Sequence, residues 1–240
     1  MKPNGTLLNI LPKNTKIMDV SKISFDEIGN EHLLTSYDTP LREDAFQLDD
    51  ELKIELIEKH FKEIMNILGM DLTDDSLKGT PNRVAKMYVK EIFSGLNPEN
   101  KPSVTLFENK YNYDQMLVEK DITFHSNCEH HFVPIFGKAH IAYISNGQVI
   151  GLSKLNRIVQ YFSKRPQVQE RLTVQIAREL QLALDTENVA VLMDAKHMCV
   201  SSRGVHDVNS STVTAYYGGK FKEEATKAEF LKYLSMKTEF

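Results

Sequence analysis

The sequence predicts an α+β fold, in which an antiparallel sheet carries paired helices on one face and follows a helical N-terminal extension. The expected elements run in the order helices, strands, paired helices, strands. This order differs from the strand–helix alternation that builds a parallel sheet. With 240 residues, of which 41% are hydrophobic, the chain is also long enough to bury a core.

The N-terminal part divides at about residue 48. Residues 1–48 are polar and lack sustained periodicity, which predicts a flexible extension. Residues 49–96 form a helical segment. Its first helix has Asp49 or Asp50 as N-cap, Gly69 as a stop, and an apolar stripe: Ile54, Ile57, Phe61, Ile64 and Leu68. A second helix opens at G-T-P-N-R-V, where Thr80 is the expected cap and Pro81 suits the first helical position.

Residues 97–240 form the main domain. Segments 116–124 and 133–144 are rich in β-branched and aromatic residues and predict strands, and Asn146-Gly147 predicts a tight hairpin turn into residues 148–150. A helix follows at S-K-L-N-R-I-V-Q-Y-F with Ser153 as cap, and another follows Arg165-Pro166. Segments 189–200 and 212–217 predict strands, and K-A-E-F-L-K-Y-L predicts a short closing helix.

Composition excludes several classes of protein. The net charge of −4 argues against a binder of nucleic acid or anionic membranes, whose affinity rests on excess positive charge. No apolar run approaches the roughly 18 residues of a membrane span, and the N-terminus lacks a signal-peptide pattern. We therefore expect a cytoplasmic protein. The only cysteines, Cys128 and Cys199, rule out a disulfide framework.

Both cysteines lie close to histidines. Cys128 and His131 are the first and last residues of C-E-H-H, a spacing that lets a loop wrap one metal ion. His197 and Cys199 lie near the end of a predicted strand, where residues two apart share a face. Thiolate and imidazole suit Zn²⁺, and three protein ligands leave the fourth tetrahedral position for water. The alternative is that the cysteines are small buried hydrophobes and the histidines are core residues. We favour the metal because each cysteine lies within three residues of a histidine.

Two polar sets are candidates for ligand contacts. Ser153, Lys154 and Arg157 lie on one helical start, and Arg203 follows in S-S-R-G. Their alternative is solvated surface charge. Gln169 and Glu170 share the first turn of the next helix and form a pair that can read a guanine edge. A Glu that simply favours a helix N-terminus explains this pair equally well.

Five motifs together closely resemble GTP cyclohydrolase I of the zinc-dependent type: G-T-P-N-R-V-A-K-M-Y, C-E-H-H-F, G-L-S-K-L-N-R-I-V, K-R-P-Q-V-Q-E-R-L-T and K-H-M-C-V-S-S-R-G. The resemblance runs from about residue 52 to the C-terminus. It implies a T-fold (tunnelling-fold) catalytic domain over residues 97–240. It also implies a homodecamer of two pentamers with active sites at subunit interfaces. The implied reaction converts GTP and water to formate and 7,8-dihydroneopterin triphosphate, the first step of pterin biosynthesis for folate-type cofactors.

The resemblance also implies a role for each candidate residue. The implied Zn²⁺ ligands are Cys128, His131 and Cys199, and the implied catalytic residues are His130 and His197. The implied guanine contacts are Gln169 and Glu170. The implied ribose and triphosphate contacts are Ser153, Lys154, Arg157, Arg203 and, in T-P-N-R, Arg83. Glu129 receives no role.

Two other functions remain to be weighed. A nitrile reductase on the same fold would use a cysteine nucleophile and NADPH, and would need no zinc ligands. A zinc-stapled interaction module would need a closed site of four ligands, and it would leave the Gln–Glu pair and the basic residues unexplained.

Overall fold

Two helices follow the predicted N-terminal extension. The structure is a computed structural model that describes residues 38–237, so residues 1–37 of the flexible extension predicted over residues 1–48 lie outside it. Helix α1 (Asp50–Ile67) begins as predicted, because the Asp49 carboxylate accepts a hydrogen bond from the backbone N–H of Leu52 at 2.8 Å. After it, Gly69 adopts a φ of +78°, which a residue without a Cβ tolerates at a helix end.

Helix α2 (Thr80–Lys86) corrects the predicted cap. Its N-cap is Gly79, and Thr80 already lies inside the helix with Pro81 in the first turn. The Thr80 hydroxyl instead accepts a hydrogen bond from Arg83 Nη2 at 2.8 Å, so the side chain that was expected to cap the backbone holds an arginine. A π-helical segment, Met87–Ile92, continues this helix.

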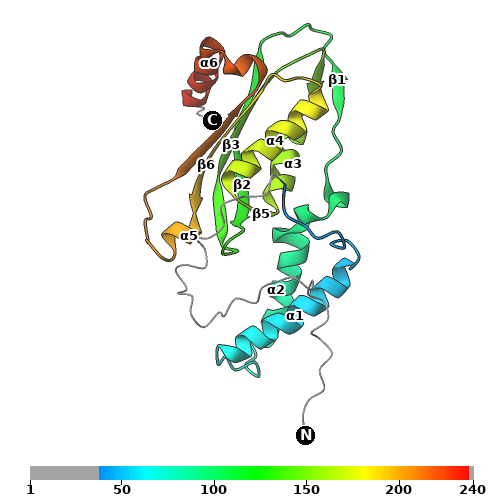
Figure 1. Ribbon diagram of the computed structural model, residues 1–240, viewed down its shortest axis with the longest axis vertical. Helices are drawn as coiled ribbons and strands as arrows, with labels where there is room; N and C mark the ends of the chain where they lie inside the picture. Colours follow the sequence, from blue (N-terminus) through cyan, green and yellow to red (C-terminus); the bar gives the residue numbers. More distant parts are fainter. Residues whose placement is uncertain (1–37, 238–240) are drawn as a thin grey trace, which may run out of the picture. The chain divides into compact units, whose positions relative to one another are not determined.

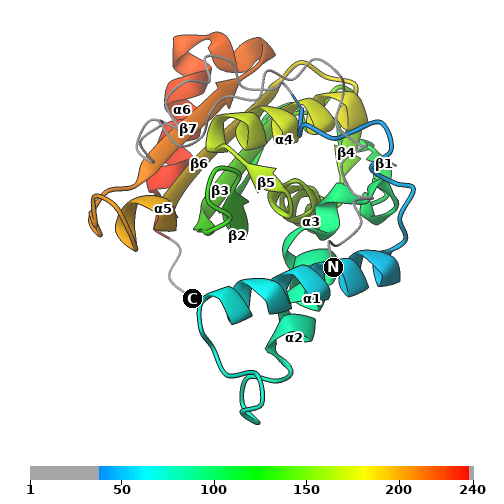
Figure 2. The ribbon, with the colours of Figure 1, turned by 60° about the horizontal axis from the view of Figure 1, so that its bottom comes forward.

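A five-stranded sheet forms the centre of the main domain. Its strands are β2 (Met116–Cys128), β3 (Pro134–Ile144), β5 (Pro166–Gln167), β6 (Val189–His197) and β7 (Thr212–Tyr217). Hydrogen bonding between neighbours gives the order β5-β2-β3-β6-β7. Figure 2 labels all five strands, and Figure 1 labels all of them but β7. All pairs are antiparallel except the short parallel pair of β2 and β5. The prediction of an α+β fold with an antiparallel sheet is therefore confirmed.

The predicted hairpin into residues 148–150 is wrong. Strand β4 (Gln148–Ile150) pairs with β1 (Leu106–Glu108) in a separate two-stranded sheet. The reason is that β3 already has β2 on one side and β6 on the other. Gly147, at φ +90°, therefore turns the chain away from the central sheet.

Helices α3 (Leu152–Ser163) and α4 (Gln169–Leu184) cover one face of the sheet, as predicted (Figure 2). The core beneath them contains alternate strand residues such as Ile141, Tyr143, Val191 and Met193. Intervening strand residues, among them Ala142, Ile144 and Ala190, belong to a second cluster on the opposite face. This cluster also contains Phe221 and, from the closing helix α6 (Glu224–Ser235), Phe230.

Two further boundaries differ from prediction. Gly151, not Ser153, is the N-cap of α3, so Ser153 is the second residue of that helix. The strand predicted over residues 189–200 ends at His197, and Cys199 belongs to a short helix, α5 (Met198–Ser201). Within residues 38–237, no helix is both long and apolar enough to cross a membrane.

Candidate metal centre and active site

The loop between β2 and β3 brings the first two candidate ligands together. The Cys128 N–H donates to the Val133 carbonyl at 2.9 Å, and the Phe132 N–H donates to the Cys128 carbonyl at 2.8 Å. Phe132 itself adopts a left-handed φ of +54°, so the chain reverses tightly. In this turn the Sγ of Cys128 lies 3.8 Å from Nδ1 of His131.

Cys199, on the short helix α5 that follows β6, is the third member of the set. The ligand atoms of Cys128, His131 and Cys199 all lie within 4.8 Å of one another. Atoms bound to one zinc ion at about 2.0–2.3 Å can lie at most about 4.6 Å apart, so small side-chain movements close the set around an ion. Two sulfurs and one imidazole are the soft donors that Zn²⁺ prefers, and the residues present therefore fit it.

The thiols also show why a cation suits this place. Burial raises the pKa of Cys199, and the neighbouring Cys128 raises it further, while Arg203 lowers it. Two thiolates this close would repel each other in a partly buried site, and a divalent cation removes that penalty.

His197 lies beside this set but does not belong to it. Its Nε2 lies 2.7 Å from Oε1 of Gln169, whose side chain is buried. The Gln169 amide nitrogen donates to the Met193 carbonyl at 3.2 Å and the Thr212 carbonyl at 2.8 Å. Because carbonyls only accept, the orientation of the amide is fixed, and its oxygen must accept from His197. His197 therefore carries its proton on Nε2, which leaves Nδ1 as the acceptor of the neutral ring.

The charge of Glu170 also affects the pKa of His197. Burial lowers the pKa of His197, and the Glu170 charge opposes that shift. The Glu170 side chain is exposed at the start of α4, whereas both polar ends of Gln169 are used inside the protein. The two members of the predicted guanine-reading pair thus have different surroundings.

The basic candidates are not gathered in one place. Arg203 Nη1 lies 2.9 Å from Nε2 of His131, at the metal set. Arg83 instead donates to the Ser76 carbonyl at 3.0 Å, in the loop before α2, and to the Thr80 hydroxyl within α2.

Helix α3 places its candidates away from the metal set. Its last residue leads into β5, where Gln167 is paired with Cys128. Ser153 and Lys154 are the second and third residues of this helix, which is about 18 Å long, and Arg157 is the sixth, in its second turn. Within one chain, Ser153 and Lys154 therefore lie at the end of α3 that is remote from β5.

Sequence reasoning missed two groups near the metal set. Arg171 pairs with Glu129 across 42 positions of sequence, and the Thr214 hydroxyl accepts from the Gln169 amide at 3.1 Å across 45. Such contacts leave no local pattern. The ion pair of Arg171 with Glu129 could have been suggested only by matching a buried arginine with a nearby acid that had no assigned role.

Comparisons with known proteins bear on the family of this chain. The family model of GTP cyclohydrolase I matches residues 57–235. The chain is 63% identical to the GTP cyclohydrolase 1 of Flavobacterium johnsoniae over 215 residues, which are 90% of this chain and 96% of the relative. It is 57% identical to that of an Enterobacter species over 196 residues, covering 81% and 88% of the two chains.

An alignment of 215 residues is longer than the segment from residue 49 to residue 240, so the likeness to the first relative reaches into the N-terminal extension. Among solved structures, that of the archaeosine synthase QueF-Like is similar at a TM-score of 0.37 and 15% identity. It covers 44% of this chain and 94% of the other, and a likeness this low bears on neither fold nor function. The family match and the close relatives decide the assignment: the chain belongs to the GTP cyclohydrolase I family.

Proposed function

We propose that this chain is a zinc-dependent GTP cyclohydrolase I, which hydrolyses GTP to formate and 7,8-dihydroneopterin triphosphate at the start of pterin biosynthesis. The observation that carries the proposal is the convergence of Cys128, His131 and Cys199 within 4.8 Å, with His197 two residues before Cys199 at the end of β6. A nitrile reductase would need no such set of ligands.

Cys128, His131 and Cys199 would hold the metal. When bound, Zn²⁺ supplies a Lewis acid that lowers the pKa of a coordinated water toward about 7. A neutral His131 ring that held the metal through one nitrogen would carry its proton on the other. Arg203 would then have no acceptor on this ring and could contact the substrate triphosphate.

His130 and His197 would move protons. An imidazole changes charge near neutral pH, which suits protonation of the purine ring as its electrons rearrange. The hydrogen bond from His197 Nε2 to Gln169 leaves Nδ1 as the nitrogen that faces this task. Gln169 thus acts through His197, and we assign it a positioning role in place of the predicted contact with guanine.

Glu170 would read the base. A carboxylate accepts hydrogen bonds from N1–H and the 2-amino group of guanine, whereas adenine would leave it unpaired. Sites that hydrogen-bond a substrate in this way reject an analogue that lacks the donors by factors of about 10⁴. The exposed position of Glu170 on the first turn of α4, close enough to act on the pKa of His197, supports this role.

The separated basic residues support a homo-oligomer, a decamer of two pentamers, with active sites between subunits. Ser153, Lys154 and Arg157 lie along α3 away from their own chain's metal set. If a neighbour supplies them, each site receives ribose and triphosphate contacts that one chain cannot give. Arg83 is the remaining triphosphate candidate, and it would have to leave its hydrogen bonds to Ser76 and Thr80.

The domain organisation and location belong to the same proposal. Residues 49–96 would be a helical segment that contacts the loop of Cys128 to Val133 between β2 and β3 (the metal loop), since the Phe93 and Phe132 ring centroids lie 5.0 Å apart. Residues 97–240 would be the T-fold catalytic domain, and residues 1–48 an extension. Cysteines that serve a metal rather than a disulfide fit a cytoplasmic protein.

The test is turnover of GTP by the purified full chain. Pterin fluorescence after oxidation and released formate are followed with zinc, after chelation, and after zinc is restored. We expect pterin and formate in equal amounts, loss on chelation, and recovery with zinc. An absence of pterin from zinc-loaded protein would overturn the proposal.

A further inference from the structure

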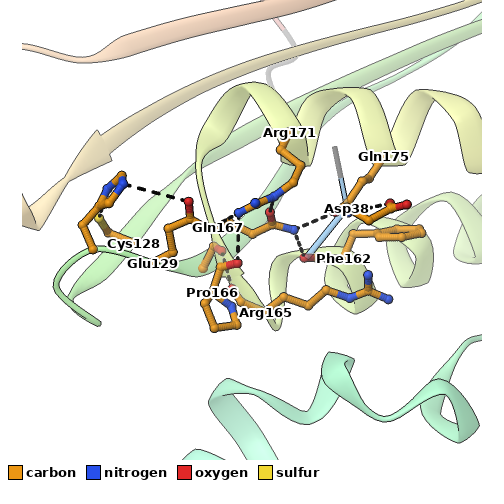
Figure 3. A network of polar contacts seen from close by, with 11 residues as sticks. Asp38, Cys128, Glu129, Phe162, Arg165, Pro166, Gln167, Arg171 and Gln175 are labelled. Atoms are coloured by element: carbon orange, nitrogen blue, oxygen red, sulfur yellow. Dashed lines mark hydrogen bonds and ion pairs between the residues drawn. The ribbon is translucent and has the colours of Figure 1, made fainter. Parts of the chain in front are cut away.

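Glu129 is the one member of C-E-H-H without a role, and the structure gives it a partner. Its carboxylate Oε2 pairs with Nη2 of Arg171, and its Oε1 lies 3.9 Å from Nε2 of His130. Its backbone N–H donates to the Gln167 carbonyl at 3.0 Å. Glu129 is therefore held through both backbone and side chain, and Figure 3 shows it between Cys128 and the Arg171 network.

The partner is itself fixed in orientation. The Arg171 side chain is only 4% exposed, and its Nε donates to the Gln167 side-chain oxygen at 3.1 Å. Gln167 is fully buried, and its amide donates to the Phe162 carbonyl at 2.9 Å and to Gln175 at 2.8 Å. Figure 3 shows this network joining the start of α4 to the end of α3. The guanidinium thus presents a fixed donor to the loop.

The pair joins two halves of the site. Glu129 follows Cys128 in the metal loop, and Arg171 follows Glu170 on the first turn of α4. Stability alone explains such a pair poorly, because exchanging both charges of a buried pair for apolar groups is often neutral. Resting on the proposed function, we propose that Glu129 and Arg171 are a positioning pair that fixes the metal loop and His130 relative to the guanine-reading turn.

Three variants of the full chain test this pair: Glu129→Gln, Arg171→Met, and the double variant Glu129→Met with Arg171→Met. The thermal midpoint is measured together with the zinc dissociation constant, by competition with a chromophoric chelator, and kcat for GTP. Removing partners that orient metal ligands typically costs about 10–100-fold in metal affinity or activity. We expect losses in this range for all three variants, while the midpoint falls in Glu129→Gln and returns toward wild type in the double variant.

A matched control is the ion pair in which Nζ of Lys101 lies 2.7 Å from Oε2 of Glu179. Glu179 is on α4, as Arg171 is, but neither partner belongs to the metal loop. Lys101→Met with Glu179→Gln should leave zinc affinity and kcat unchanged. If the double Glu129/Arg171 variant regains zinc affinity and kcat together with its midpoint, the pair only stabilises the fold and the inference is wrong.

A conservative change covers the case in which the variants fail to fold. Arg171→Lys keeps the charge but lacks the fork that contacts both Gln167 and Glu129. It should fold with reduced zinc affinity and kcat, and wild-type values for both would also overturn the inference. Zinc competition needs no GTP, so it tests the pair even if the wild-type protein turned over no GTP and the proposed function failed.

Discussion

Replacing Gln169 with Met tests whether this residue positions His197 or reads guanine. Methionine keeps about the length of the side chain but removes both hydrogen-bonding ends. His197 Nε2 then loses the acceptor that now lies 2.7 Å away, and its proton is free to move to Nδ1. The ring would present the wrong nitrogen to the substrate in part of the molecules.

The size of the effect follows from the lost contact. A partly buried donor left without its acceptor costs about 1–3 kcal/mol. At about 1.4 kcal/mol for each factor of ten, kcat should fall by about 5–150-fold. The dissociation constant of GTP should stay within about twofold, because Glu170 still supplies the contact to the base.

Thr214→Val is the matched control. It removes one of three acceptors of the Gln169 amide, but the Met193 and Thr212 carbonyls still fix the amide's orientation. This variant should lose stability of about 1 kcal/mol and keep kcat near wild type.

The assay measures kcat by pterin fluorescence and GTP affinity by equilibrium dialysis. If Gln169→Met weakens GTP binding and leaves kcat at saturating GTP unchanged, Gln169 reads the substrate and does not position His197. An unchanged kcat with unchanged affinity would refute both roles.

Two further predictions concern assembly and pH. Oligomers made only of Cys199→Ala subunits or only of Arg157→Ala subunits should be inactive. When the two are mixed after dissociation, about a quarter of wild-type activity should return by random assortment, since an interface site takes one residue from each chain. No recovery in verified mixed oligomers would place both residues in one subunit's site. Burial lowers the pKa of His140, although Asp121 and Asp194 oppose the shift, so the unfolded chain binds a proton near pH 6.5 that the folded chain does not. The free energy of unfolding should therefore fall as pH drops from about 7.5 to 5.5, and less steeply in His140→Gln, as measured by denaturant titration at fixed protein concentration; equal slopes in the two proteins would contradict this.

Local patterns predicted the elements whose causes are local. The carboxylate cap at Asp49 and the helix that follows Arg165-Pro166 depend on residues a few positions apart, and both occur. The hairpin at Asn146-Gly147 failed because β6, more than 40 positions further on, occupies the edge of β3 that β4 would need. Strand pairing over such distances leaves no trace in a short window.

The site divides in the same way. The proximity of each cysteine to a histidine predicted the metal set, and the ligand atoms of Cys128, His131 and Cys199 do converge. The choice between His130 and His131 came from the family resemblance, since spacing alone left it open. The contact of Gln169 with His197 was not predicted, because it depends on which carbonyls surround a buried amide.

The central claim is that two thiolates and one imidazole hold the zinc ion that this chain needs to hydrolyse GTP. X-ray absorption at the zinc edge of the purified, active protein measures these ligands directly. We predict one zinc per chain with two sulfurs at about 2.3 Å and one imidazole nitrogen at about 2.0 Å, and one sulfur fewer in Cys199→Ala. A zinc without sulfur ligands, or four protein ligands with no place for water, would contradict the account.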